Sequence, residues 1–260
     1  MSSTNQQENS RRALITGGAM GLGKALADQL VKDGWHVTTI DREANQLPEP
    51  DEPRQHYRVD LSDKIAVIDL LERLQSQAPF DLVILNAARS ASGKFEEIPL
   101  SAYENLLTLN AEIPIIMAST LARNGCFKKG SNLVFVSSLS HFTGYPGAAV
   151  YGASKDVVAT YAKSIRKPFA KHQIAVSCVF PGPLQTAQAA RHSPANASEE
   201  KRMSPEIAAA MILKSVFAGK SKIFPGFAPR AFAMFGKLVP GFADRTMRKI
   251  IHEKLDRNVF

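Results

Sequence analysis

The strongest constraint on the fold is a series of short apolar runs that alternate with helix-like segments. The runs expected to form strands are RRALIT (11–16), WHVTTI (35–40), HYRVDL (56–61), DLVILN (81–86), NLVFVSS (132–138), IAVSCVFPG (174–182) and a short KIFPG (222–226). Between them, residues 23–34 and 63–75 have the spacing of helices. Continuous apolar strands are buried on both faces, and strands that alternate with helices form a parallel sheet. We therefore expect a doubly wound α/β fold with seven parallel strands.

Length and composition favour one domain. The chain has 260 residues, of which 45% are hydrophobic and 22% charged, and these fractions are ordinary for a globular protein. No apolar run approaches the ~18 residues that span a bilayer, and the polar start MSSTNQQENS does not resemble a secretory signal. We expect a disordered leader over residues 1–10, a single domain over 11–260, and a cytoplasmic location. Cys126 has no metal-like partner nearby and Cys178 lies in an apolar run, so we expect no metal site.

The net charge of +8 is concentrated at the carboxyl end of the chain. Residues 220–260 hold nine Lys or Arg and three Asp or Glu, which leaves only +2 for the first 219 residues. A nearly balanced domain argues against nucleic acid as a partner.

A glycine-rich turn follows the first predicted strand, in the sequence TGGAMGLG from Thr16 to Gly23. In doubly wound folds, ligands bind beyond the carboxyl ends of the strands. Glycine lacks the Cβ that would keep a pyrophosphate away from the backbone, and the next helix offers its N-terminal N–H groups to an anion. The turn therefore predicts a dinucleotide site, although a tight turn without a ligand has the same pattern.

Three more polar residues end predicted strands. Asp41 can accept hydrogen bonds from both hydroxyls of an adenosine ribose and would repel a 2′-phosphate, which favours NAD(H), whereas Arg42 beside it can pair with that phosphate. Asp60 can accept a bond from the adenine amino group or cap the next helix, a position that Ser62 can also fill. The Asn86 amide can tie two strand ends together.

Ser138, Tyr151 and Lys155 form the candidate catalytic group. Ser138 ends the predicted fifth strand, and the four-residue spacing in YGASK places Tyr151 and Lys155 on one helical face. A phenol has a pKa near ~10, and an adjacent ammonium lowers it by favouring phenolate. A serine hydroxyl beside the phenol can hold a substrate oxygen. A Tyr–Lys pair alone is uninformative, but together with the glycine-rich turn it indicates catalysis.

These motifs resemble the short-chain dehydrogenase/reductase superfamily in its compact, single-domain form. The resemblance runs from about residue 13 to residue 186 and implies a Rossmann-type fold. TGGAMGLG resembles the family's TGxxxGxG loop, while LNAA stands where the family has NNAG. The catalytic residues implied are Asn110, Ser138, Tyr151 and Lys155. The cofactor-binding residues predicted are Gly17, Met20, Gly21, Leu22, Gly23, Asp41, Arg42, Asp60, Leu61, Asn86, Ala87, Tyr151, Lys155, Pro181, Gly182 and Thr186.

The resemblance implies an oxidoreductase that interconverts a secondary alcohol and a ketone, with NAD preferred or NADP as cofactor. Tyr151 would exchange the proton, Lys155 would lower its pKa and hold the ribose, and Asn110 would support a water relay through its carbonyl. The family also pairs subunits through the helix bearing Tyr151, so we expect a homodimer. The alternatives are a dinucleotide-sensing regulatory protein without turnover, or the same enzyme attached peripherally to a membrane.

Pro114 follows Asn110 by four residues within a helical stretch. It has no N–H, so the Asn110 carbonyl loses its helical donor and the helix should kink there. The kink either frees an acceptor for the mechanism or is merely tolerated. His141, Phe142 and Tyr145 follow Ser138 and are candidates to line the substrate pocket.

Two segments towards the carboxyl end have open interpretations. Residues 187–203 stand where the family that the chain resembles has its substrate-covering segment. Their small and polar residues are typical of a mobile lid or of an ordinary surface loop. Residues 227–260 form a basic, amphipathic helical tail in which residues 244–259 have an apolar face at helical spacing. The apolar residues of the tail are Phe227, Phe232, Phe235, Phe242, Met247, Ile250, Ile251, Leu255 and Val259. The tail can lie on an anionic membrane or pack on the domain or across a dimer, and we favour packing.

Overall fold

The computed structural model describes residues 10–43, 53–192 and 202–238, together with Gly241, Arg245, Lys249 and Val259. The predicted leader and most of the tail beyond residue 238 lie outside the described residues, so those expectations stay predictions.

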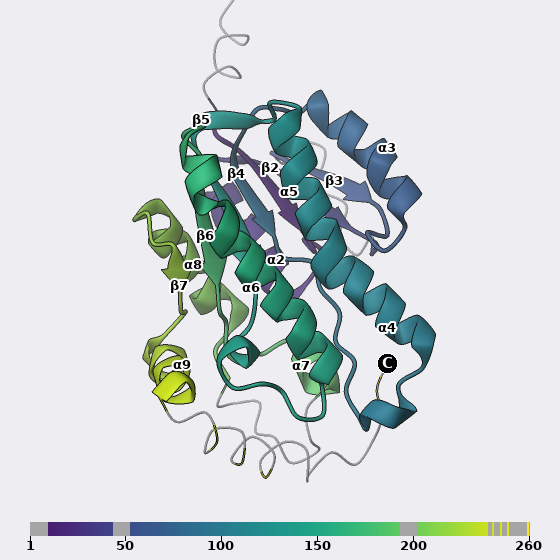
Figure 1. Cartoon of the computed structure of the whole chain (residues 1–260). Coiled ribbons are helices and arrows are strands. Elements are labelled where there is room, and N and C mark those ends of the chain that lie inside the picture. Colours follow the sequence, from purple (N-terminus) through teal and green to yellow (C-terminus); the bar gives the residue numbers. More distant parts are fainter. Residues whose placement is uncertain are drawn as a thin grey trace, which may run out of the picture.

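The described chain forms one sheet of seven parallel strands in the order β3-β2-β1-β4-β5-β6-β7 (Figure 1). The strands are β1 (Arg12–Thr16), β2 (His36–Asp41), β3 (Arg54–Arg58), β4 (Phe80–Leu85), β5 (Phe127–Val136), β6 (Ala175–Val179) and β7 (Lys222–Ile223). The chain winds outward from β1 to β3 and then returns to the other side of β1 at β4, so the order reverses between β1 and β4. The predicted doubly wound sheet is confirmed, and this reversal is where such folds bind ligands.

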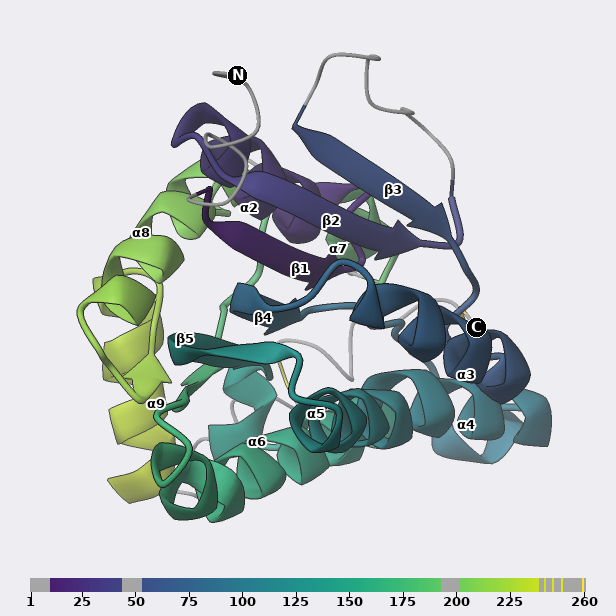
Figure 2. The same ribbon diagram turned by 90° about the horizontal axis from the view of Figure 1, so that it is seen from above.

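Helices cover both faces of the sheet (Figure 2). α2 (Gly21–Lys32) and α8 (Pro205–Phe217) lie on one face. The other face carries α3 (Lys64–Gln75), α5 (Ile113–Arg123) and α6 (Ala149–Ala170). The remaining elements are η1 (Phe95–Glu97), α4 (Leu100–Leu107), η2 (Thr108–Glu112), η3 (Leu139–Phe142), α7 (Ala187–Arg191) and α9 (Phe227–Leu238).

The central strands are apolar throughout because they serve two cores at once. In β1, Ala13 and Ile15 belong to the core beneath α2 and α8, whereas Leu14 between them belongs to the opposite core. β4 alternates in the same way, with Leu82 facing one core and Val83 the other. Since successive side chains of a strand point to opposite faces, burial of both faces removes any polar alternation.

The third strand differs from its prediction. It runs from Arg54 to Arg58 rather than over residues 56–61, because the edge strand takes its register from β2, where Arg58 pairs with Asp41. Asp60 therefore lies two residues beyond the strand. It does not cap the next helix either: Asp63 does, since its Oδ1 accepts from the backbone N–H groups of the first turn of α3.

The helical run from α4 to α5 contains the predicted irregularity, in a form the sequence did not specify. Thr108–Glu112 is a π-helical turn, in which the N–H of Ile113 bonds to the carbonyl of Thr108, five residues back. Pro114 follows at once and supplies no N–H to the Asn110 carbonyl. A single wide turn accommodates the proline without a sharp break, and such turns are frequent at functional sites.

The same run, Leu100–Arg123, is long and apolar enough by length and composition to cross a membrane. Its apolar character has another explanation. Ile113, Met117 and Leu121 are each no more than 1% exposed and pack into the core on one face of the sheet. It is a core helix of the α/β domain.

Candidate active site

The glycine-rich turn passes from β1 to α2 and is held against the neighbouring strands. The N–H of Gly17 donates to the carbonyl of Ile40 at 2.7 Å. Gly17 has φ 72° and Gly21 has φ 54°, the left-handed region that favours glycine. At Gly23 a Cβ would collide with the carbonyl oxygen of Gly17. The N-cap residue Met20 makes no side-chain cap and the first turn of α2 has no acidic residue, so its N–H groups suit an anion such as a pyrophosphate.

Thr16 and Asn86 lock the end of β4 onto the end of β1. The backbone N–H groups of Asn86 and Ala87 donate to Oγ1 of Thr16 at 3.0 and 3.1 Å. Nδ2 of Asn86 donates to the carbonyls of Thr16 and Gly17 at 3.1 and 3.3 Å. The tie expected of Asn86 is present, whereas the part of Thr16 was missed. The only signal was a hydroxyl residue at the end of an apolar strand.

Ala88 stands where the resemblance led us to expect a glycine. Among the residues that the structure describes, Gln173 is the only non-glycine residue with a positive φ. Alanine at position 88 therefore introduces no left-handed strain.

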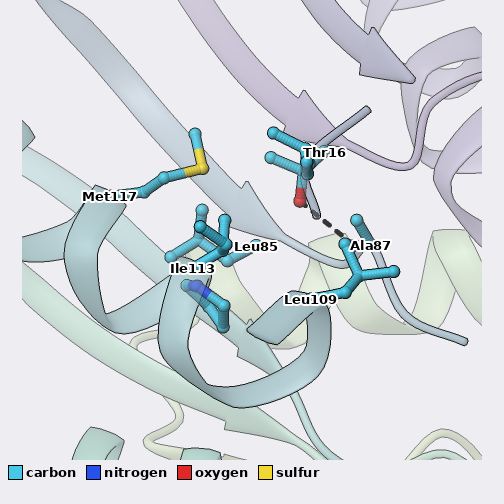
Figure 3. A pocket seen from close by; sticks show the side chains of 8 residues that line it. Thr16, Leu85, Ala87, Leu109, Ile113 and Met117 are labelled. Atoms are coloured by element: carbon cyan, nitrogen blue, oxygen red, sulfur yellow. Dashed lines mark hydrogen bonds between the residues drawn. The ribbon is translucent and has the colours of Figure 1, made fainter. Parts of the chain in front are cut away.

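A small apolar hollow opens beside this junction (Figure 3). Its lining residues are Thr16, Leu61, Leu85, Ala87, Leu109, Ile113, Pro114 and Met117. Leu61 and Ala87, two predicted cofactor residues from different loops, are brought together there.

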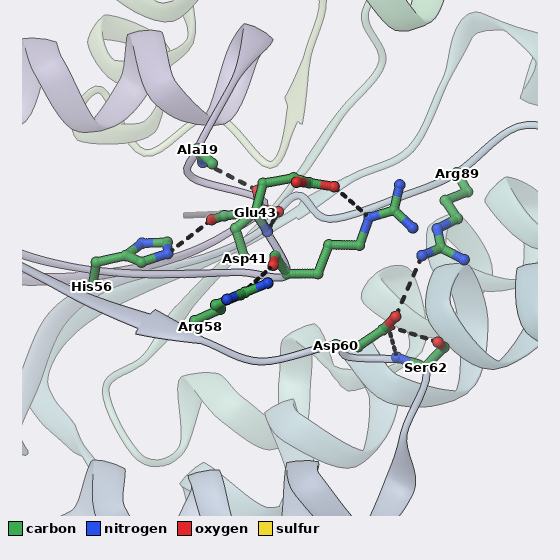
Figure 4. Close-up of polar contacts among 9 residues, drawn as sticks. Ala19, Asp41, Glu43, His56, Arg58, Asp60, Ser62 and Arg89 are labelled. Atoms are coloured by element: carbon green, nitrogen blue, oxygen red, sulfur yellow. Dashed lines mark hydrogen bonds and ion pairs between the residues drawn. The ribbon is translucent and has the colours of Figure 1, made fainter. Parts of the chain in front are cut away.

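Asp41 braces the glycine-rich turn from the end of β2 (Figure 4). Its Oδ2 accepts from the N–H of Ala19 at 3.1 Å and its Oδ1 from the N–H of Glu43 at 3.2 Å. Nε of Arg42 lies 3.3 Å from a carboxylate oxygen of Glu43, and Nε of Arg58 donates to the Arg42 carbonyl at 3.2 Å. Each oxygen of the Asp41 carboxylate accepts one of these hydrogen bonds and has a further lone pair for another donor at the rim. The neighbouring Arg42 is paired with Glu43.

Asp60 and Asn110 are joined through Arg89, a residue to which the sequence had assigned no role. Oδ1 of Asp60 accepts from the N–H and the hydroxyl of Ser62 at 2.9 and 2.6 Å, while its Oδ2 lies 3.4 Å from Nη2 of Arg89. The Asn110 amide bonds the Arg89 backbone in both directions, at 2.8 Å each. Arg89 belongs to a loop without periodicity, and only its position three residues after Asn86 placed it on the rim.

The side chain of Asn110 is buried, at 1% exposed for the residue. Its Nδ2 also donates to Oγ of Ser154 at 3.1 Å, and that hydroxyl donates to the carbonyl of Tyr151 at 2.7 Å. Asn110 therefore connects the loop after β4 to the first turn of α6. Its side chain therefore positions the backbone of Arg89 and the hydroxyl of Ser154.

The predicted catalytic residues converge at the ends of β5 and α6. Ser138 lies two residues beyond β5 rather than at its end, and its Oγ accepts from the N–H of Ser140 at 3.2 Å. The side chain of Ser138 lies close enough to the hydroxyl of Tyr151 to lower its pKa. Nζ of Lys155 donates to the carbonyl of Val136 at 2.9 Å and lies 5.9 Å from the centre of the Tyr151 ring. Serine, phenol and ammonium thus share one corner of the rim.

The pKa of Tyr151 differs from the sequence prediction, and the pKa of Lys155 is shifted as well. Burial raises the pKa of Tyr151 to about 12; the side chain of Ser138 opposes that rise, and Tyr145 adds to it. Burial also lowers the pKa of Lys155 to about 8. We expected Lys155 to hold the pKa of this phenol below its ordinary value, whereas burial holds that pKa above it. Removal from water disfavours the phenolate and the ammonium alike, and Lys155 is directed to a carbonyl.

The candidate pocket residues after Ser138 separate into two groups. The ring of Tyr145 packs edge-on against that of Tyr151, with centroids 6.0 Å apart. His141 instead places Nδ1 at 2.9 Å from Oδ1 of Asp156, and Phe142 joins an aromatic cluster beside β6 and β7. The ring of Tyr145 therefore packs on the phenol of the candidate catalytic group, whereas the ring of His141 is directed to Asp156.

The predicted lid begins beside the glycine-rich turn. A Cβ at Gly21 would lie 3.2 Å from Cγ2 of Thr186, so Thr186 borders that turn as expected. Its Oγ1 accepts from the N–H of Ala189 and caps α7, which makes the start of the lid helical. At the other end, the N–H of Gln185 donates to the carbonyl of Met203 at 2.9 Å. Residues 193–201 between these anchors lie outside the described chain.

Ser92 joins three segments that are distant in sequence. Its hydroxyl lies 3.0 Å from Nδ1 of His192, just after α7. Its backbone exchanges two hydrogen bonds with Val259, at 2.9 and 2.8 Å. Only 2% of Ser92 is exposed. No local pattern predicts such contacts, because they depend on the path of the whole chain.

Within the ranges described, no group of three or more His, Cys, Asp or Glu residues is placed to hold a metal.

A parallel doubly wound sheet with a glycine-rich turn at the reversal of strand order is the fold of dinucleotide-binding α/β proteins. Residues 11–197 match the family model described as short chain dehydrogenase. The chain belongs to the short-chain dehydrogenase family.

Curated relatives and solved structures agree with this assignment. An uncharacterized oxidoreductase from Myxococcus xanthus is 29% identical over 180 residues, 66% of this chain and 71% of the relative. The 3-ketodihydrosphingosine reductase of Mus musculus is 24% identical over 226 residues, 79% and 68% of the two chains. A short-chain dehydrogenase from Sphingobium yanoikuyae in complex with NADPH superposes with a TM-score of 0.73 at 20% identity, over 90% of this chain and 96% of that one. A 4-hydroxyisoleucine dehydrogenase complexed with NADH gives 0.75 at 20% identity, over 84% and 98%.

Proposed function

We propose that this protein is an NAD(P)-dependent oxidoreductase that interconverts a secondary alcohol and a ketone, with Tyr151 as the acid and base. The observation that carries the proposal is the convergence of Ser138, Tyr151 and Lys155 at one corner of the rim, where Nζ of Lys155 lies 5.9 Å from the centre of the Tyr151 ring. A protein that only binds a dinucleotide needs the cradle but has no use for this trio.

The cofactor would be held by residues from both halves of the sheet. The N–H groups at the start of α2 would bind the pyrophosphate, Asp41 the adenosine ribose, and Lys155 the nicotinamide ribose. Leu61 and Ala87 would supply an apolar wall for the adenine. When bound, the dinucleotide supplies the acceptor of a hydride in alcohol oxidation and its donor in ketone reduction.

The protein's own groups handle the proton. With a pKa of about 12, the Tyr151 phenol is protonated at neutral pH and can give a proton to a ketone oxygen. Ser138 would hold that oxygen in place. In oxidation the phenolate takes the hydroxyl proton instead, and an ammonium at Lys155 would stabilise the phenolate. We therefore expect Nζ of Lys155 to leave the Val136 carbonyl when the site is loaded.

We propose a preference for NAD(H) over NADP(H). The Asp41 carboxylate would repel a 2′-phosphate, and Arg42, the residue best placed to pair with that phosphate, already has Glu43 as a partner. The mouse relative is named as a reductase of a 3-keto compound, which supports a ketone as the oxidised substrate.

Turnover on a panel of ketones tests the proposal, followed through the absorbance of NADH or NADPH. Tyr151→Phe should abolish turnover and leave dinucleotide affinity nearly intact, because only the proton-transferring oxygen is removed. Tyr161→Phe is the matched control on α6, since the Tyr161 hydroxyl bonds Ser119 away from the site. Substantial turnover by Tyr151→Phe would refute the mechanism. Tight dinucleotide binding without turnover on a broad panel would favour the sensing protein.

We also propose a homodimer that pairs through α6. Val157 on this helix is 44% exposed and Leu107 at the end of α4 is 41% exposed, so this side of the domain offers apolar side chains for a partner. Light scattering in solution tests the expected dimeric mass, and a monomer at micromolar concentration would contradict it.

A further inference from the structure

α9 presents apolar side chains to solvent. Phe227, Met234 and Leu238 are 86%, 64% and 74% exposed. They are separated by seven and four residues, so they lie on one face of the helix. We expected the tail to pack on its own domain or across a dimer; the exposed Phe227 does not pack on its own domain, which leaves a partner or a membrane to cover it. A helix of a globular domain normally turns such a face inward, so this arrangement requires an explanation.

Contacts on the opposite side fix the orientation of α9. Ala233 is 3% exposed, and a Cβ at Gly236 would lie 2.5 Å from the carbonyl oxygen of Phe142. Glycine is thus what allows α9 to approach η3 so closely. Rotating the helix to bury Phe227, Met234 and Leu238 would replace this glycine with bulkier residues. The exposed apolar face is a fixed part of the structure.

The charges around α9 distinguish among partners. Residues 207–249 contain eight Lys or Arg and one acidic residue, Asp244. Arg230 of α9 is exposed, and so are Arg245 and Lys249 further along. A second copy of this chain would bring positive charge against positive charge in a two-fold contact. An anionic lipid surface would instead attract these cations and accept the apolar side chains.

We propose that α9 docks the protein on an anionic lipid bilayer, with Phe227, Met234 and Leu238 inserted among the lipids and the basic side chains at the headgroups. The sequence had left this alternative open and the orientation of α9 now supports it. The opposite side of α9 borders the candidate active site. A Cβ at Gly182 would lie 3.5 Å from Pro229 of α9, and one at Gly226 would lie 2.9 Å from Met203 at the end of the lid segment.

The position of α9 also bears on the substrate. In Figure 1, α9 and α7 lie at the same lower end of the molecule. If the proposed oxidoreductase function holds, docking would bring α7 and Met203, the described ends of the lid segment, close to the bilayer. The substrate class would then be a lipophilic ketone or alcohol that partitions into lipid.

Vesicle co-sedimentation of the full-length protein tests the docking. The vesicles are phosphatidylcholine alone or phosphatidylcholine mixed with phosphatidylglycerol. We expect binding to the anionic vesicles only, with release at high salt. The triple variant Phe227→Ser, Met234→Ser, Leu238→Ser should bind about tenfold less. The matched control is Ile65→Ser, Ile68→Ser on α3, where these side chains are 75% and 58% exposed, and it should bind as well as the native protein.

Dinucleotide affinity, measured in parallel, shows whether each variant is folded, since no substitution lies in the cofactor cradle. Failure of the native protein to bind anionic vesicles overturns the proposal, and so does equal binding by the triple variant. A loss of oligomers in the triple variant without vesicle binding by the native protein assigns this face to a second copy. Vesicle binding without turnover on any ketone leaves the docking intact and refutes the enzymatic function alone.

Discussion

Lys155→Met should make the protein inactive and, at neutral pH, more stable. Lys155 is 3% exposed, and burial lowers its pKa from 10.5 to about 8. One pKa unit corresponds to about 1.4 kcal/mol, so holding the buried ammonium opposes folding by about 3 kcal/mol. Methionine has a similar length and no charge. The lowered pKa already includes the attraction between the ammonium and the Val136 carbonyl, so the substitution costs in addition only the hydrogen bond that a neutral amine would make there, about 1 kcal/mol. The expected net gain is about 2 kcal/mol.

The dependence on pH identifies the cause. Between the folded pKa of about 8 and the unfolded pKa of about 10.5, the unfolded chain binds more protons at this lysine than the folded protein does. The stability of the native protein therefore rises with pH across this window. The variant lacks the lysine, so its advantage should shrink from neutral pH to about pH 10. Tyr151 is present in both proteins, and its effect on stability at high pH largely cancels in the difference.

The assay is urea unfolding of both proteins at neutral pH and near pH 10. The matched control is Lys163→Met, an exposed lysine on the same helix, for which the difference from the native protein should be small at both pH values. Two results would refute the reasoning. One is a variant that is clearly less stable than the native protein at neutral pH. The other is a stability difference that does not change with pH.

Three further substitutions test other parts of the site. Asp41→Ala should move the ratio of kcat/KM for NADH and NADPH towards NADPH by about tenfold; an unmodified enzyme that already prefers NADPH contradicts the assignment. Thr16→Val keeps the shape of the side chain but leaves two backbone N–H groups at the end of β4 without their acceptor, so urea unfolding should show a loss of about 2 kcal/mol. Gly23→Ala should abolish dinucleotide binding, because its Cβ collides with the backbone. The control Gly152→Ala, whose Cβ would meet nothing nearer than 3.5 Å, should instead add about 0.5–1 kcal/mol of stability to α6. Normal dinucleotide affinity of Gly23→Ala would contradict this expectation, because it would show that the turn can relax to accommodate the Cβ.

Much of the fold was predictable because its signals are local. Central strands such as β1 and β4 are buried on both faces, and their apolar runs show this directly. The bounds of the edge strand β3 were predicted incorrectly. Tyr57 is its only buried residue, so its bounds depend on pairing with β2 rather than on an apolar pattern of its own.

The site was predictable where one segment carries the whole pattern. The glycine-rich turn and the pair Tyr151 and Lys155 are of this kind. Arg89 and Ser92 were missed because their partners are distant in sequence and their loops have no periodicity. The pKa of Tyr151 was misjudged for a related reason: sequence gives its neighbours, whereas burial of the phenol depends on everything packed around it.

The π-helical turn Thr108–Glu112 makes the helix that contains it intolerant of length changes. A regular helix turns by about 100° per residue, so deleting one residue from this turn would rotate everything before it relative to α5. Asn110 would no longer face the backbone of Arg89, to which it makes two hydrogen bonds. A substitution at a neighbouring surface position changes one side chain, but a deletion here would change the direction of every side chain in α4. We therefore expect natural variants of this chain to differ in residue type along this run and to keep its length.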